Sequence, residues 1–218
     1  LMINKAILKT VDINAQINLD SLDDYLLYQS VLGKNTLFKD ISKIQRGEIL
    51  TLDLRTQKTI STSRILPEAK NLSIESYDDY KKYIKEEITK QTINALDTDL
   101  DLTFQLSGGI DSNLMMSIAS HHFPEKKKYS VSSSVKGNFD DDELTYIKKS
   151  VEHFKTEHEI VEIGEENFFD YLEESIEFLD EPVGDPGVVA QFIVNEKISE
   201  FSKIGIAGQG ADELYFGY

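Results

Sequence analysis

One segment of the chain joins a short apolar run directly to two glycines, an aspartate and a serine. It reads Leu102-Thr103-Phe104-Gln105-Leu106-Ser107-Gly108-Gly109-Ile110-Asp111-Ser112, and a helical pattern follows. Adjacent glycines let consecutive backbone N–H groups converge, and the start of a helix favours negative charge. A Gly-Gly pair alone is common in ordinary turns. The complete order of strand, glycines, acid and helix predicts an anion-binding loop.

Asp111 restricts the kind of anion that this loop can bind. A carboxylate beside a polyphosphate is strongly repelled unless a divalent cation lies between them. The segment therefore predicts Mg²⁺ and a nucleotide that carries pyrophosphate. A Walker-type loop is excluded because no lysine follows the glycines.

Composition limits the partners and the setting. The net charge of −16 argues against nucleic acid, which requires an excess of Lys and Arg. The absence of cysteine excludes disulfides, thiolate metal sites and cysteine nucleophiles, and it is compatible with a reducing compartment. The chain has neither a membrane-length apolar run nor the zones of a signal peptide. We expect a cytoplasmic protein with no membrane partner.

The pattern changes near residue 70. Before it, residues 6–11 are typical of a strand, and residues 19–29 of a helix with Leu22, Tyr25, Leu26 and Gln29 on one face. Residues 47–54 and 58–63 predict a hairpin. We therefore expect residues 1–70 to form a small α+β appendage.

Beyond residue 70 apolar strands alternate with helices. A helix capped by Ser76 should run to Leu96. Further strands are expected at 102–106, 128–133, 158–163 and 203–207, and helices at 112–119, 142–154, 167–179 and 188–201. This alternation predicts an α/β fold over residues 71–218, a parallel sheet with helices on both faces. Ligands of such sheets bind beyond the carboxyl ends of the strands.

A second glycine cluster, Ala207-Gly208-Gln209-Gly210-Ala211-Asp212-Glu213-Leu214-Tyr215-Phe216-Gly217-Tyr218, also follows an apolar strand. It should lie at the same sheet edge, so that Asp111 and Asp212 could face one Mg²⁺. Alternatively, Asp212 and Glu213 simply begin a helix at Ala211.

Together these motifs resemble the synthetase domain of the asparagine synthetase family, which belongs to the PP-loop ATP pyrophosphatases, an adenine nucleotide alpha hydrolase-like fold. Three further pieces are similar: Asp180-Glu181-Pro182-Val183-Gly184-Asp185-Pro186, Phe139-Asp140-Asp141-Asp142-Glu143, and Thr156-Glu157-His158. The segments 36–41 and 46–47 resemble the end of the family's glutaminase domain. Residues 1–70 would then be the last part of that domain and a linker.

The resemblance implies an ATP-dependent synthetase. A substrate carboxylate would attack the α-phosphate of ATP, and ammonia would then displace AMP to give an amide. Ser107, Gly108, Gly109, Asp111 and Ser112 would cradle the pyrophosphate, Leu106, Val131, Gly208 and Gln209 would complete the ATP site, and Asp111 and Asp212 would act in catalysis and hold Mg²⁺. Glu181 and Asp185 are candidates for the substrate pocket. The carboxylate could be aspartate or another acid, such as a sugar carboxylate.

Some features depart from the family pattern. Gln209 stands where the family usually has Glu, and the chain has no Cys to act as a glutaminase nucleophile. We expect a fragment that is truncated at its C-terminal end and is inactive in isolation. Its ammonia would come from a glutaminase domain that is absent here. Leu214, Tyr215 and Phe216 would then form a bare flank that favours self-association. A β-lactam synthetase-like enzyme and a non-catalytic nucleotide-binding module remain alternatives.

Overall fold

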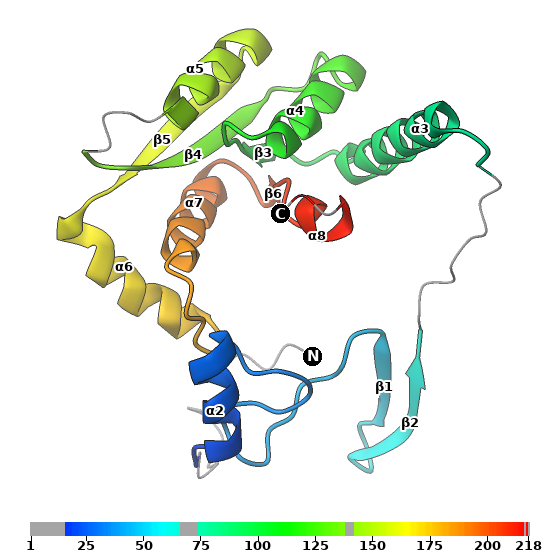
Figure 1. Ribbon diagram of the computed structural model, residues 1–218, viewed down its shortest axis with the longest axis vertical. Coiled ribbons are helices and arrows are strands. Elements are labelled where there is room, and N and C mark those ends of the chain that lie inside the picture. Colours follow the sequence, from blue (N-terminus) through cyan, green and yellow to red (C-terminus); the bar gives the residue numbers. More distant parts are fainter. Residues whose placement is uncertain (1–15, 66–73, 138–141, 216, 218) are drawn as a thin grey trace. The chain divides into compact units, whose positions relative to one another are not determined.

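The computed structural model describes residues 16–65, 74–137, 142–215 and 217 (Figure 1). The chain forms two compact units. The front unit comprises Leu1–Ser73 and Glu173–Pro186, and the core unit comprises Ile74–Leu172 and Gly187–Tyr218. The expected strand at residues 6–11 and the motif residues 139–141 lie outside the described residues. No helix in the described ranges is both long and apolar enough to cross a membrane.

The front unit contains one helix and one hairpin. Helix α2 is Leu19–Tyr28, and strands β1 (Glu48–Asp53) and β2 (Lys58–Arg64) pair antiparallel, as predicted. The carboxylate of Asp53 closes the turn by accepting from the backbone N–H of Arg55 at 2.8 Å. The helix ends at the left-handed residue Gln29 (φ 59°).

The four residues predicted to share one face of α2 differ in burial. Leu22 and Tyr25 are half-buried, but Leu26 is 71% exposed and Gln29 is also exposed. Ser21 is the buried residue of this helix, and its hydroxyl accepts from the Asn18 amide at 2.8 Å. The inward side of α2 therefore includes Ser21 as well as Leu22 and Tyr25.

The core unit alternates strands and helices. Its elements are α3 (Tyr77–Leu96), β3 (Leu102–Gln105), α4 (Ile110–His122), β4 (Tyr129–Val135), α5 (Asp142–Phe154), β5 (Glu157–Ile163), α6 (Glu165–Phe178, whose last turns belong to the front unit), α7 (Gly187–Phe201), β6 (Ile204–Ile206) and α8 (Ala211–Tyr215). Helix α3 begins as predicted, because the Ser76 hydroxyl accepts from the Asp79 N–H at 3.1 Å.

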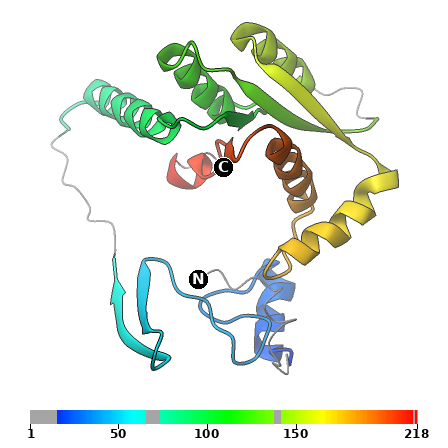
Figure 2. The same ribbon diagram turned by 180° about the vertical axis from the view of Figure 1, so that it is seen from behind.

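The sheet is parallel, with strand order β5-β4-β3-β6, so the predicted α/β class is confirmed. Figures 1 and 2 show α4 and α5 on one face and α7 on the other. The chain builds outward from β3 to β5, then crosses back through α7 to place β6 on the other side of β3. The strand exits that carry the two glycine clusters are therefore direct neighbours.

Apolar residues fill the space on both faces of this sheet. On the α4 side the buried cluster is Leu96, Leu102, Phe104, Met116 and Ala119. On the α7 side the buried clusters are Val131, Val194 and Ile198, and Ile163, Val189 and Ile193. Because β3 is packed from both sides, the loop that leaves it starts from a fixed position.

Candidate functional site

The first glycine loop, residues 106–109, is held by side chains of the helix that follows it. Helix α4 begins at Ile110, earlier than the predicted residue 112, because Gly109 adopts the extended conformation of an N-cap. The Asn113 amide donates to the carbonyls of Ser107 at 3.1 Å and Gly109 at 2.7 Å. The buried Ser112 hydroxyl lies 3.1 Å from the Ser107 carbonyl. These contacts hold the loop's carbonyls against α4.

The backbone N–H groups of the same loop donate to side-chain oxygens that a ligand could displace. Ser107 N–H donates to the Ser112 hydroxyl at 3.1 Å, Gly109 N–H to the Ser107 hydroxyl at 3.2 Å, and Gly108 N–H to the Glu143 carboxylate at 3.3 Å. All three acceptors are side-chain oxygens, and α4 has no side-chain cap hydrogen bond. An anion can replace such acceptors at a helix N-terminus, as a phosphate-binding loop requires.

The second glycine loop, residues 207–210, touches the first. A Cβ atom at Gly208 would lie 2.8 Å from the Asp111 Cβ and 2.9 Å from the Ser112 backbone nitrogen. This contact follows from the pairing of β6 with β3, in which Phe104 lies opposite Ile206. The structure thus brings Gly208 onto the N-terminus of α4, where the predicted residues Asp111 and Ser112 lie.

Asp212 lies in the first turn of α8, where acids are favoured by the helix dipole. The Gly217 N–H donates to the Asp212 carbonyl at 3.1 Å, and a Cβ at Gly217 would lie 2.0 Å from the Asp212 Oδ1. The glycine therefore leaves room for the Asp212 carboxylate.

The donors present suit Mg²⁺ bound together with a nucleotide. Within the described residues, no cluster of at least three His, Cys, Asp or Glu side chains could hold a metal ion. Mg²⁺ commonly takes only one or two protein carboxylates and completes its shell with water and phosphate oxygens. Asp111 and Asp212 would supply two such carboxylates, and their Mg²⁺ role stays a prediction.

The family model described as asparagine synthase matches residues 83–218, which include both glycine loops. The chain belongs to this family. Asparagine synthetase [glutamine-hydrolyzing] 1 of Bacillus subtilis is 26% identical over 93% of this chain and 31% of its own length. A relative from Methanocaldococcus jannaschii is 28% identical over 98% of this chain and 41% of its own length. The chain spans about a third to two fifths of the length of these relatives.

Two of the residues expected at the ATP site of this asparagine synthase family member are buried in the core. Leu106 is 1% exposed and Val131 is 0% exposed. Their main chains join β3 to β4, since Leu106 N–H donates to the Val131 carbonyl at 2.9 Å. Each residue is buried as a whole, and the place of both in the ATP site stays a prediction.

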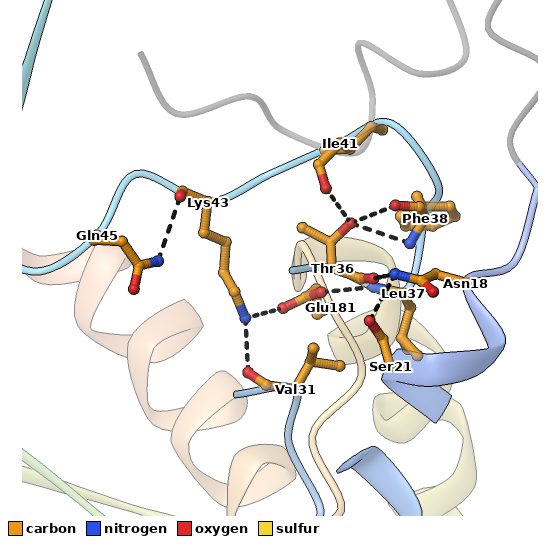
Figure 3. Close-up of polar contacts among 10 residues, drawn as sticks. All are labelled: Asn18, Ser21, Val31, Thr36, Leu37, Phe38, Ile41, Lys43, Gln45 and Glu181. Carbon is orange, nitrogen blue, oxygen red and sulfur yellow. Dashed lines mark hydrogen bonds and ion pairs between the residues drawn. The ribbon is translucent and has the colours of Figure 1, made fainter. Parts of the chain in front are cut away.

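Glu181 and Asp185 belong to the front unit. The Glu181 carboxylate accepts from the Lys43 ammonium at 2.9 Å and from the Leu37 N–H at 3.0 Å (Figure 3). Lys43 also donates to the Val31 carbonyl at 2.8 Å. Glu181 thus ties the Asp-Glu-Pro segment to the loop after α2. The substrate roles of Glu181 and of the exposed Asp185 stay predictions.

Three side chains at or near the loops were not predicted from the sequence. Asn113 binds the first loop, and Gln105 and Gln191 form a hydrogen-bonded pair connected to Gln209. Asn113 could have been found as a polar residue in the first turn of α4. Gln191 gave no such signal, because it lies within a helix that shows no nucleotide motif.

Proposed function

We propose that this chain is the nucleotide-binding part of an ATP-dependent synthetase that forms an amide from a carboxylate and ammonia. The contact between two glycine loops at the carboxyl ends of neighbouring parallel strands carries this proposal. Family membership supports ATP as the nucleotide, and the names of the relatives suggest aspartate as the carboxylate and glutamine as the source of ammonia.

In the proposed reaction a carboxylate oxygen bonds to the α-phosphorus of ATP as the bond to pyrophosphate breaks. Ammonia then attacks the acyl carbon, loses a proton, and displaces AMP. The loop amides of residues 107–109 would bind the pyrophosphate portion and hold the α-phosphate in line with the carboxylate. When bound, Mg²⁺ would neutralise phosphate charge, with Asp111 and Asp212 as its protein ligands.

The residues of the first glycine loop suit a reaction that needs no protein nucleophile. Both reacting groups are anionic, so alignment and charge neutralisation matter more than a protein nucleophile. The chain contains no cysteine, and we expect ammonia to be supplied by the remainder of a glutaminase domain. Residues 1–70 would be the last part of that domain.

Calorimetric titration with ATP, with and without Mg²⁺, tests the proposal. We expect weak binding without Mg²⁺ and tighter binding with it. Asp111→Asn should remove most of this difference, because it replaces the charged carboxylate with a neutral amide. Asp101→Asn is the matched control, since Asp101 is exposed and precedes β3 at the opposite end of the strand. Equal ATP affinity of the natural chain in both buffers would contradict the proposal.

A further inference from the structure

Three glutamines from separate elements meet at the carboxyl end of β3. Gln105 is the last residue of that strand, Gln191 lies in α7, and Gln209 lies between the glycines of the second loop. The Gln209 amide donates to Gln191 Oε1 at 2.8 Å, and the Gln105 amide donates to the same oxygen at 3.1 Å. Gln191 therefore joins the strand that leads into the first loop to the loop that follows β6.

The hydrogen-bonding capacity of Gln191 is fully used. Its Oε1 accepts two bonds, and its Nε2 donates to Gln105 Oε1 at 3.0 Å and to Asn195 Oδ1 at 3.0 Å. A primary amide has two acceptor sites and two N–H donors, so no capacity is left over. Three of these four bonds reach Gln105 and Gln209, so Gln191 connects β3 to the second loop.

This connection complements the contact at Gly208. Gly208 lies against Asp111 and Ser112, and the next residue, Gln209, is held by Gln191. The second loop is thus fixed to the first by close packing on one side and by an amide bridge on the other. Asp212 lies three residues after Gln209, so the bridge holds the start of the segment that carries this carboxylate.

We propose that Gln191 is a positioning residue that sets the separation between Asp111 and Asp212, and thereby the Mg²⁺ dependence of nucleotide binding. This inference rests on the proposed function, because it assumes that both carboxylates serve one Mg²⁺–nucleotide. Gln191 acts through Gln105 and Gln209. It has no charge to contribute, so its effect appears as geometry rather than as direct attraction for the ion.

Gln191→Met tests the proposal, because methionine keeps the size of the side chain and loses all four hydrogen bonds. The quantity to measure is the ratio of ATP dissociation constants without and with Mg²⁺. A few tenths of an ångström of misplacement and the loss of a bridging hydrogen bond should lower this ratio about threefold to tenfold. A purely structural role would change the unfolding midpoint and leave the ratio of the folded protein unchanged.

Two further variants sharpen the result. Gln191→Glu keeps oxygen acceptors for Gln105 and Gln209, so without nucleotide the exchange of residues 207–215 should stay closer to that of the natural chain than in Gln191→Met. Its ratio of ATP dissociation constants is not compared, because the added charge repels free ATP more strongly than Mg²⁺-bound ATP. Asn195→Ala is the matched control. Its bond with Gln191 lies within α7, on the exposed side, and does not cross between the loops. This variant should leave the ratio unchanged.

Hydrogen exchange of residues 207–215, measured without nucleotide, separates the two ways in which the inference can fail. Faster exchange in Gln191→Met than in Asn195→Ala supports the bridge itself. If the natural chain shows no Mg²⁺ dependence, the proposed function fails and the metal-positioning role of Gln191 is rejected with it. If the natural chain shows the dependence and Gln191→Met keeps the full ratio, the inference alone is overturned.

Discussion

The two glycine loops lie side by side but are built differently. The first leaves β3 and enters a 13-residue helix, and Ser112, Met116, Ile118 and Ala119 of that helix are buried. The second leaves the three-residue strand β6 and enters a five-residue helix with no buried residue. Leu214 and Tyr215 of α8 are 73% and 48% exposed. The first loop is therefore part of the packed core, whereas the second depends on contacts with its neighbours.

This difference assigns a separate task to each loop. A loop fixed by a long packed helix can present backbone N–H groups in one arrangement before any ligand binds. A loop held by Gly208 and by Gln209 can shift when a ligand or a mutation changes those contacts. We infer that the geometry of the site is most sensitive to the few contacts that join the second loop to the first.

The largest effect is expected from Gly208→Ala. The new Cβ would lie 2.9 Å from the Ser112 backbone nitrogen and 3.0 Å from the Asp111 carbonyl carbon, and backbone atoms cannot rotate away. The loops must separate, and ATP affinity in Mg²⁺ should fall about tenfold or more. Titration calorimetry at a temperature where the variant is folded measures this change.

Gly210→Ala in the same loop distinguishes the effect of backbone strain from the effect of a steric clash between the loops. Gly210 has φ 91° and open space around its Cβ position, so alanine there adds strain of about 1 kcal/mol without pushing the loops apart. Its ATP affinity should remain closer to that of the natural chain. Equal losses in the two variants would mean that the contact between the loops does not set the site.

A smaller effect, on stability, should distinguish the loops. Ser112 is 6% exposed, and Ser112→Ala removes the hydroxyl that accepts from the Ser107 N–H at 3.1 Å. Because the half-buried Ser107 N–H loses its partner, the free energy of unfolding should fall by about 1 kcal/mol. Gln209→Ala changes an exposed residue and should stay within about 0.5 kcal/mol. Urea denaturation of both variants measures the difference, and the reverse order would refute the contrast between the loops.

Much of this architecture follows from local sequence patterns. The hydrophobic periodicity and the Ser76 cap predicted α3, the bounds of α5 were predicted as residues 142–154, and the alternation of strands and helices predicted the parallel sheet. These features depend on residues close together in the chain. The start of α4 was missed because an N-cap glycine gives no side-chain signal, so Asp111 was placed before the helix instead of in its first turn.

Contacts between distant segments were not predictable in the same way. Residues 173–186 were expected with the core, yet they form part of the front unit through pairs such as Glu181 with Lys43. Likewise Glu143 reaches the first loop and Gln191 reaches the second only because the sheet order places their elements there. Such pairings depend on the tertiary arrangement, which single-chain periodicity does not specify.

The smallest expected effect concerns the strands on the β5 side of the first loop. His158 of β5 is half-buried, its Nδ1 lies 2.8 Å from the Ser130 hydroxyl of β4, and its buried Nε2 has no hydrogen-bond partner in the described part of the chain. Burial lowers the pKa of His158 below 6.5, against opposing contributions from Ser130 and Glu159. The folded protein therefore disfavours the protonated imidazole.

The sign of the resulting pH dependence follows from proton binding. Between the lowered pKa of folded His158 and the value of 6.5 in the unfolded chain, the unfolded state binds more protons, so stability should fall as the pH decreases through this window and level off below it. Urea denaturation from pH 7.5 downward measures the slope, with His158→Asn as the comparison because asparagine keeps a polar atom near Ser130 and does not titrate. The slope difference between the two proteins should be modest.

Hydrogen exchange measured over the same pH range compares the two sides of the sheet. Because β6 lies on the far side of β3 from β5, the exchange rates of residues 207–215 should change less with the protonation of His158 than those of β4. Equal sensitivity of the two regions would show that both loops share one cooperative unit, and the assignment of the second loop to local contacts would then be wrong.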